Sequence, residues 1–216
     1  MQYLQLVNDV LKALREDQVD SVAESEYSEL IGRFVNQAKA QVERKWGWSV
    51  LRQNLGFDTV VDVDEGYSVT GIGKSFRELS VFNVTDQSDL RKASSTWIAR
   101  QRKLTTVTKG APTYYAFRGL DANGDMKVDI WPTPDKVYTI DIDVQVPQDD
   151  LSADIDTLSI PEWPVRLKAY ELALRERGED DGLSWQEIRE DYITALNDEI
   201  ALDTIRNPGE TNWEVE

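Results

Sequence analysis

Apolar side chains recur at helical spacing in the first fifty residues. The stripe over residues 3–14 consists of four side chains three or four positions apart: Leu4, Val7, Leu11 and Leu14. This spacing predicts an amphipathic helix. The same spacing predicts a second helix over residues 25–47, which either Ser21 or Ser25 can cap.

Helical spacing returns after residue 160. The segment Pro-Glu-Trp-Pro, residues 161–164, suits a first helical turn, where the missing N–H of proline costs nothing. This helix is expected to stop at Gly178. A last helix is expected to run on until Pro208 ends it.

Between these helices the apolar positions alternate, as they do in strands. The clearest example is residues 138–146, with five apolar side chains on one face: Tyr138, Ile140, Ile142, Val144 and Val146. Such alternation is typical of a sheet with one face in water. A short helix near residues 95–102 is expected to interrupt the strands, because Ser94 or Ser95 can cap it.

Helical ends therefore flank a β middle. The pattern predicts an α+β fold in which the N- and C-terminal helices form a helical bundle, with an antiparallel β domain inserted between them. The predicted helical domain comprises residues 1–50 and 160–206. The β domain comprises residues 51–159, and residues 207–216 form a C-terminal tail.

The segment DANGDMKVDIWP, residues 121–132, carries carboxylates at alternate positions, as calcium loops do. Two requirements of a calcium loop fail. Met126 stands in place of the turn glycine, and Pro132 in place of the glutamate that closes the metal's ligand shell. Asn123-Gly124 instead favours a hairpin with a two-residue type I′ turn, and no calcium site is expected.

Composition removes much of enzyme chemistry. The 216 residues include no Cys and no His, which excludes thiol nucleophiles, imidazole bases and the common zinc sites. No phosphate-binding or nucleophile motif is present either. We therefore identify no catalytic, cofactor-binding or metal-binding residue, and expect a protein that is not an enzyme and needs no cofactor.

The charge balance is strongly acidic. With 24 basic and 40 acidic residues the net charge is −16, which opposes general binding to nucleic acids and suits a surface that DNA passes without sticking. No segment fits a signal peptide or a membrane span. We expect a soluble protein, made in a cytoplasm, with no membrane contact.

An alternative of a different class stays open, namely a carboxylate-dependent α+β hydrolase or a small-ligand-binding protein. Asp141 and Asp143 lie on the same side of one predicted strand. Two carboxyl groups can share acid and base roles, provided that both face one cleft.

One stretch runs against the charge balance. Five positive charges fall within thirteen residues around Trp97: Arg91, Lys92, Arg100, Arg102 and Lys103. Such a stretch can dock on an acidic neighbouring copy, bind nucleic acid, or form an ordinary solvated face. Trp97, Arg100 and Arg102 are candidate interface residues on the first of these interpretations.

The C-terminal residues supply further candidates. After Arg206, Pro208 ends the last helix, and the polar segment that follows carries Asn212 and Trp213. Tryptophan is enriched at interfaces, so this tail is expected to order against a partner or a neighbouring subunit. The alternative is that Trp213 folds back onto its own helices.

Four stretches, in this order, resemble the head-to-tail adaptor proteins of tailed bacteriophages: YLQLVNDVLKALRED, YSELIGRFVNQAKAQVERKWGWSVLR, TYYAFRGLDANGDMKVDIWPTPD, and RERGEDDG followed by ALNDEIALDTIRNPGETNW. The resemblance covers nearly the whole chain. It implies a structural virion protein at the head–tail junction, made in the host cytoplasm, with a helical and a β domain.

The resemblance also implies partners. Such adaptors form a ring, usually dodecameric, under the portal protein, and continue the DNA channel to a tail or nozzle protein without binding DNA specifically. The candidate residues for contact with the portal or a neighbouring subunit are then those named above: Trp213, Asn212, Pro208, Arg206, Trp97, Arg100 and Arg102.

Overall fold

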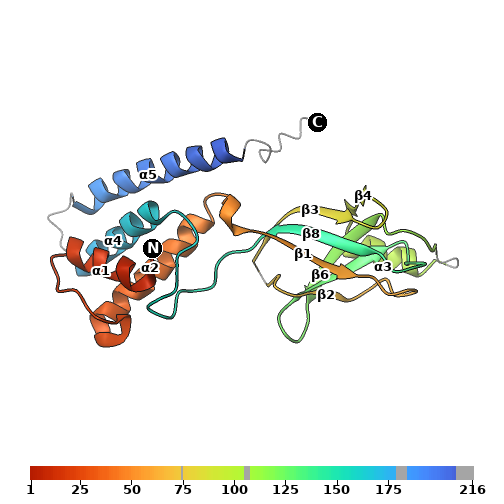
Figure 1. Ribbon diagram of the computed structural model, residues 1–216, viewed down its shortest axis with the longest axis horizontal. Coiled ribbons are helices and arrows are strands. Elements are labelled where there is room, and N and C mark those ends of the chain that lie inside the picture. The colour runs from red at the N-terminus through yellow and green to blue at the C-terminus, as the bar shows by residue number, and fades with distance from the viewer. Residues whose placement is uncertain (74, 105–107, 179–183, 208–216) are drawn as a thin grey trace. The chain divides into compact units, whose positions relative to one another are not determined.

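The computed structural model describes residues 1–73, 75–104, 108–178 and 184–207 (Figure 1). The chain divides into two compact units, Met1–Leu51 with Pro147–Glu216, and Arg52–Val146. We call them the helical unit and the β unit, after the elements that they contain. The predicted α+β class is confirmed.

The helical unit packs its helices around one apolar core. Its described elements are α1 (Tyr3–Ala13), η1 (Val22–Glu24), α2 (Glu26–Glu43), η2 (Ser49–Leu51), α4 (Glu162–Arg177) and α5 (Ser184–Arg206). Leu6 of α1, Ile31 of α2 and Val165 of α4 are completely buried. Tyr192 and Leu196 of α5 are buried in the same core.

The helix ends follow local chemistry. Ser21 and Ser25 both act as caps: the Ser21 hydroxyl accepts from Ala23 N (3.4 Å) at η1, and that of Ser25 from Ser28 N (3.1 Å) at α2. α4 ends at Gly178, which has φ 60°, as predicted. α2 stops earlier than predicted, where the Trp48 indole donates to the Val42 carbonyl (3.0 Å).

A buried ion pair fastens the segment that returns from the β unit. Lys39 and Glu43, one turn apart on α2, lie 3.6 Å from each other and are almost fully buried. The Lys39 ammonium donates to the Gln148 carbonyl (2.5 Å), and Glu43 accepts from Gln148 N (3.2 Å). Burial raises the pKa of Glu43, and the charge of Lys39 partly offsets this.

The β unit contains two four-stranded sheets in its described part. The first has the order β1 (Arg52–Asp58), β8 (Thr139–Gln145), β3 (Arg77–Asn83), β4 (Ser88–Asp89); the second has β2 (Tyr67–Val69), β7 (Met126–Trp131), β6 (Tyr114–Leu120), β5 (Arg91–Lys92). Their apolar faces share one core, with Ile140 and Ile142 from β8 and Val128 and Ile130 from β7. α3 (Ser95–Arg102) packs on β6 and β7 of the second sheet.

The prediction of a wholly antiparallel β domain is wrong for one pair. β5 pairs with β6 in parallel, Arg91 opposite Tyr114 and Lys92 opposite Tyr115. A parallel pair needs a long crossover connection, and residues 93–113, which include α3, supply it.

The hairpin predicted around Asn123-Gly124 is present, but its turn type differs. β6 and β7 pair in antiparallel register up to Leu120 opposite Met126. Asn123 lacks the positive φ that a type I′ turn requires; Gly124 alone in this turn has it, at 91°. The turn differs because the Asp121 carboxylate accepts from Asn123 N (2.8 Å) and Asp125 N (2.9 Å), which holds a five-residue loop.

Candidate interaction surfaces

The tryptophan of the predicted basic stretch belongs to an aromatic cluster. Ser94 caps α3 by accepting from Trp97 N (3.1 Å), and Ile98 is fully buried beneath the helix. The Trp97 ring lies 5.0 Å from that of Tyr114 and 5.3 Å from that of Trp131. Trp97 therefore attaches α3 to the sheet and leaves only part of its ring to solvent.

Arg102 faces the molecule's own carboxylates. Its guanidinium lies 3.0 Å from Asp64, 3.0 Å from Glu65 and 3.4 Å from Asp129, and it also donates to the Asp64 carbonyl. The Asp129 side chain is only 2% exposed. The positive charge of Arg102 is thus neutralised within the β unit, where it holds residues 64–65 against α3.

Alternation along β7 explains how Asp129 comes to be buried. Val128 and Ile130 enter the core between the sheets, so Asp129 points to the opposite face, on which α3 packs. Asp129 also accepts from Gly66 N (3.1 Å). Nothing in the local sequence marks these partners of Arg102, because they lie 27 to 38 positions away.

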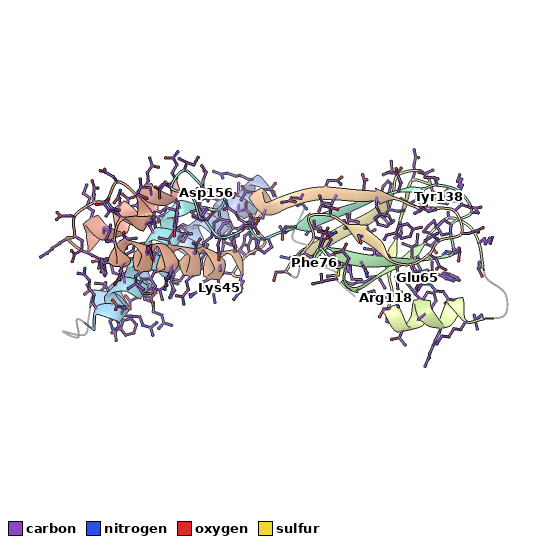
Figure 2. The ribbon with its side chains drawn as sticks, turned by 90° about the horizontal axis from the view of Figure 1, so that it is seen from below. Lys45, Glu65, Phe76, Arg118, Tyr138 and Asp156 are labelled. Carbon is purple, nitrogen blue, oxygen red and sulfur yellow. The ribbon has the colours of Figure 1, made fainter. Side chains whose placement is uncertain are left out.

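A second arginine extends the cluster toward solvent. Arg118 lies 2.7 Å from Glu65, and Figure 2 shows the two side chains next to each other. The hydrogen bond that Arg118 donates to Glu65 raises the pKa of Arg118, and the charge of Asp129 raises it further. Glu65 and Arg118 line a surface hollow of about 480 Å³ together with Gly66, Gly119, Leu120 and Lys127.

The remaining cations of the basic stretch differ in their surroundings. Lys92 pairs with Glu78 at 2.6 Å. Arg100 on α3 and Lys103, just after it, are exposed and form no ion pair with any residue that the structure describes. Arg91 is likewise exposed, on β5, and has no ion pair with a described residue, so these three positive charges of the basic stretch are available to a partner.

The C-terminal end of α5 is tied to the segment that leads into the β unit. Asp203, which is nearly buried, accepts from the Trp46 indole (2.9 Å) and from the Ser49 hydroxyl (2.6 Å). Arg206 lies one turn further on and is exposed. Pro208, Asn212 and Trp213 lie outside the described residues.

Asp143, one of the two carboxylates of the alternative hydrolase hypothesis, joins strands of the first sheet. Asp143 on β8 accepts from Asn54 of β1 (2.8 Å) and from Ser80 of β3 (2.9 Å). Both of its oxygens are used between strands. Among described residues, no group of three or more acidic side chains is placed to hold a metal ion.

The family described as SU10 adaptor protein matches residues 1–212, which include both units. No curated protein matches the chain.

No helix in the described part is long and apolar enough to span a membrane.

Proposed function

Since the chain belongs to the SU10 adaptor protein family, whose members are structural adaptors of bacteriophages, we propose that it joins the phage head to the tail as a ring of identical copies. The ring, a dodecamer on this proposal, sits under the portal protein. It continues the DNA channel to a tail or nozzle protein. The family match over residues 1–212 is the observation that carries this proposal.

The charge of the chain supports a passive role toward DNA. A net charge of −16 disfavours attachment of the phosphate backbone, so DNA can move past the ring without specific contacts. The same charge opposes association of free copies. We therefore expect the isolated chain to be monomeric and to form a ring only on a preformed portal ring.

We further propose that the helical and β units are two separate domains of the adaptor. Arg206 and the residues after it, Pro208, Asn212 and Trp213, meet the portal or a neighbouring subunit. Arg100 and the exposed part of Trp97 contribute to an interface from the β unit. Arg102 supports that interface from within, because its guanidinium holds the loop at residues 64–65.

The decisive experiment mixes the purified chain with the portal ring of the same phage and images the product by electron microscopy. We expect a second ring stacked on the portal, with one copy of the chain per portal subunit. Stable rings in the absence of portal, measured by light scattering, would contradict ordered assembly. A chain that stays unbound in the presence of portal would contradict the proposed function itself.

A further inference from the structure

One end of the first sheet of the β unit gathers exposed valines. Of the twelve large apolar side chains that are exposed in the described part of the chain, five belong to loops at this end: Val60, Val61, Val63, Val84 and Val137. We call them the valine end. β1 finishes here, with Asp58 opposite Thr139, and Val84 N donates to the Thr139 carbonyl (2.9 Å).

The valine end lies at the opposite end of the β1–β8 pair from the chain's entry into the β unit. The chain enters this unit at Arg52, which pairs with Gln145 near its exit, six positions from Asp58 opposite Thr139. At about 3.3 Å per residue the two ends are roughly 20 Å apart. Figure 2 shows Tyr138, next to Val137, beyond the tip of the β1 arrow.

Hydrogen bonds order the loop that carries Val60, Val61 and Val63. Val63 N donates to the Val60 carbonyl (3.1 Å), and Asp62 N to the Pro134 carbonyl (3.0 Å). The Tyr67 hydroxyl accepts from Val60 N (3.0 Å) and donates to the Val63 carbonyl (2.5 Å). A loop that is already ordered loses little entropy on binding, so its exposed valines suit a docking surface.

Carboxylates border the valine end. Besides Glu65, which pairs with Arg102 and Arg118, four exposed ones lie in its strand ends and loops: Asp58, Asp62, Asp86 and Asp135. Two lysines are close by: Lys109 pairs with Asp62 at 2.5 Å, and Lys136 lies over the Tyr138 ring. Four negative and two positive charges leave a local excess of −2, so a complementary partner surface is apolar with a positive border.

α3 of the same chain carries such a surface. Arg100 and Lys103 are exposed, and Leu104, just after the helix, is 57% exposed. The sequence from Leu90 to Thr108 contains no acidic residue. This surface, which we call the α3 end, is therefore apolar and basic where the valine end is apolar and acidic.

We propose that the valine end of one copy docks on the α3 end of a neighbouring copy. The two surfaces adjoin where Arg102 of α3 binds Asp64 and Glu65, but they are different patches of one molecule. A contact between the valine end of one copy and the α3 end of the next is therefore head-to-tail. Repetition of a head-to-tail contact closes a ring when the rotation between copies allows it. The inference rests on the proposed adaptor function and specifies how neighbouring β units in the ring meet.

Disulfide trapping tests this contact even if it is transient, because the natural chain contains no cysteine. Val61→Cys protein is mixed with Ala99→Cys protein in a glutathione redox buffer at low salt. The matched control mixes Val61→Cys with Ala201→Cys, since Ala99 and Ala201 are both exposed helical alanines. We expect the cross-linked heterodimer to form about tenfold faster with Ala99→Cys than with Ala201→Cys, and the difference to shrink at high salt.

A charge exchange adds a second measurement. Asp86→Lys, added to the Val61→Cys protein, should slow its cross-linking to the Ala99→Cys protein. Arg100→Glu, added to the Ala99→Cys protein, should then restore the rate of cross-linking. Equal rates for Ala99→Cys and Ala201→Cys would overturn the inference, as would a predominance of Val61→Cys homodimers. If rings form on the portal and Asp86→Lys leaves them intact, the proposed docking surface is wrong while the adaptor function stands. If no ring forms on the portal even with the natural chain, the proposed adaptor function itself is contradicted.

Discussion

At the scale of single residues, buried charges fasten segments that lack regular structure. Lys39 and Glu43 hold the returning chain at Gln148, and Arg102 with Asp129 holds the loop that carries the valines. Removal of one partner from such a pair leaves an uncompensated charge, which costs more than the intact pair contributes. The two pairs therefore give testable consequences for stability.

Lys39→Met should lower the free energy of unfolding by about 3 kcal/mol at pH 7, because Glu43 then stays charged and buried without its partner. The folded-state pKa of Glu43 is already raised, and the loss of Lys39 raises it further. Between the unfolded and folded pKa values the folded state binds more protons, so the variant's deficit should shrink as the pH falls toward 5. Urea unfolding at both pH values measures this.

Lys45→Met is the matched control for the Lys39 variant. Lys45 is exposed just beyond α2, and Figure 2 labels it. Its replacement should change stability by less than about 0.5 kcal/mol. A deficit for Lys39→Met that did not depend on pH would show that lost packing, rather than the charge of Glu43, is responsible.

Arg102→Met should destabilise the protein by about 3 kcal/mol, because Asp129 would be left buried with its main cationic partner removed. Arg100→Met should leave the melting temperature nearly unchanged, since Arg100 is exposed on the same helix. Thermal melts compare the two variants. Similar melts would mean that Arg102 is not needed to hold the fold.

At the scale of elements, the β6–β7 hairpin depends on one backbone conformation and one carboxylate. Gly124 has φ 91°, and the Asp121 carboxylate accepts from two amides of the same loop. These hydrogen bonds lower the pKa of Asp121, and the hydrogen bond from the backbone amide of Asp125 has the largest effect. Among the carboxylates of this segment, Asp121 thus stabilises the turn.

Gly124→Ala should cost about 1 to 2 kcal/mol, because a Cβ strains a residue with positive φ. No atom lies within 4 Å of the added Cβ, so crowding does not contribute. Gly73→Ala is the control: its Cβ also meets nothing, and its φ lies outside the left-handed region. If both variants lost equal stability in urea unfolding, the φ of Gly124 would not explain the cost.

Calcium should not bind this hairpin with micromolar affinity. Asp121 and Asp125 already accept hydrogen bonds from backbone amides, Asp125 from Gly71 N (3.2 Å). A bidentate closing carboxylate is absent from the twelfth position, which is Pro132. Calorimetric titration checks this; micromolar binding that disappears in Asp125→Ala would contradict it.

At the scale of the whole molecule, we expect the residues after the end of α5 to contribute to assembly and not to the stability of the fold. Asp203 fixes this end to Trp46 and Ser49, so these bonds do not require any residue after 207. Deletion of residues 208–216 should leave the melting temperature within about 2 °C and weaken binding to the portal ring. Intact portal binding together with a fall of several degrees would show that Trp213 belongs to the chain's own core.

The sequence by itself determined the order of the helices, the β region between them, the α+β class and the position of the hairpin at Asn123-Gly124. Periodicity, caps and glycines are local properties, so the Ser25 cap and the Gly178 end could be predicted from neighbouring residues. The family resemblance, likewise, rests on the order of residues alone.

Only the tertiary structure decided what surrounds each charge. Arg102 was predicted as a candidate interface residue, and its surroundings depend on α3 packing over Asp129 of β7 and over the loop at Asp64. The valine end likewise brings together loops near residues 61, 84 and 137. No local sequence pattern predicts these contacts between distant residues, because the pairing of distant strands and helices is set by the packing of the whole core.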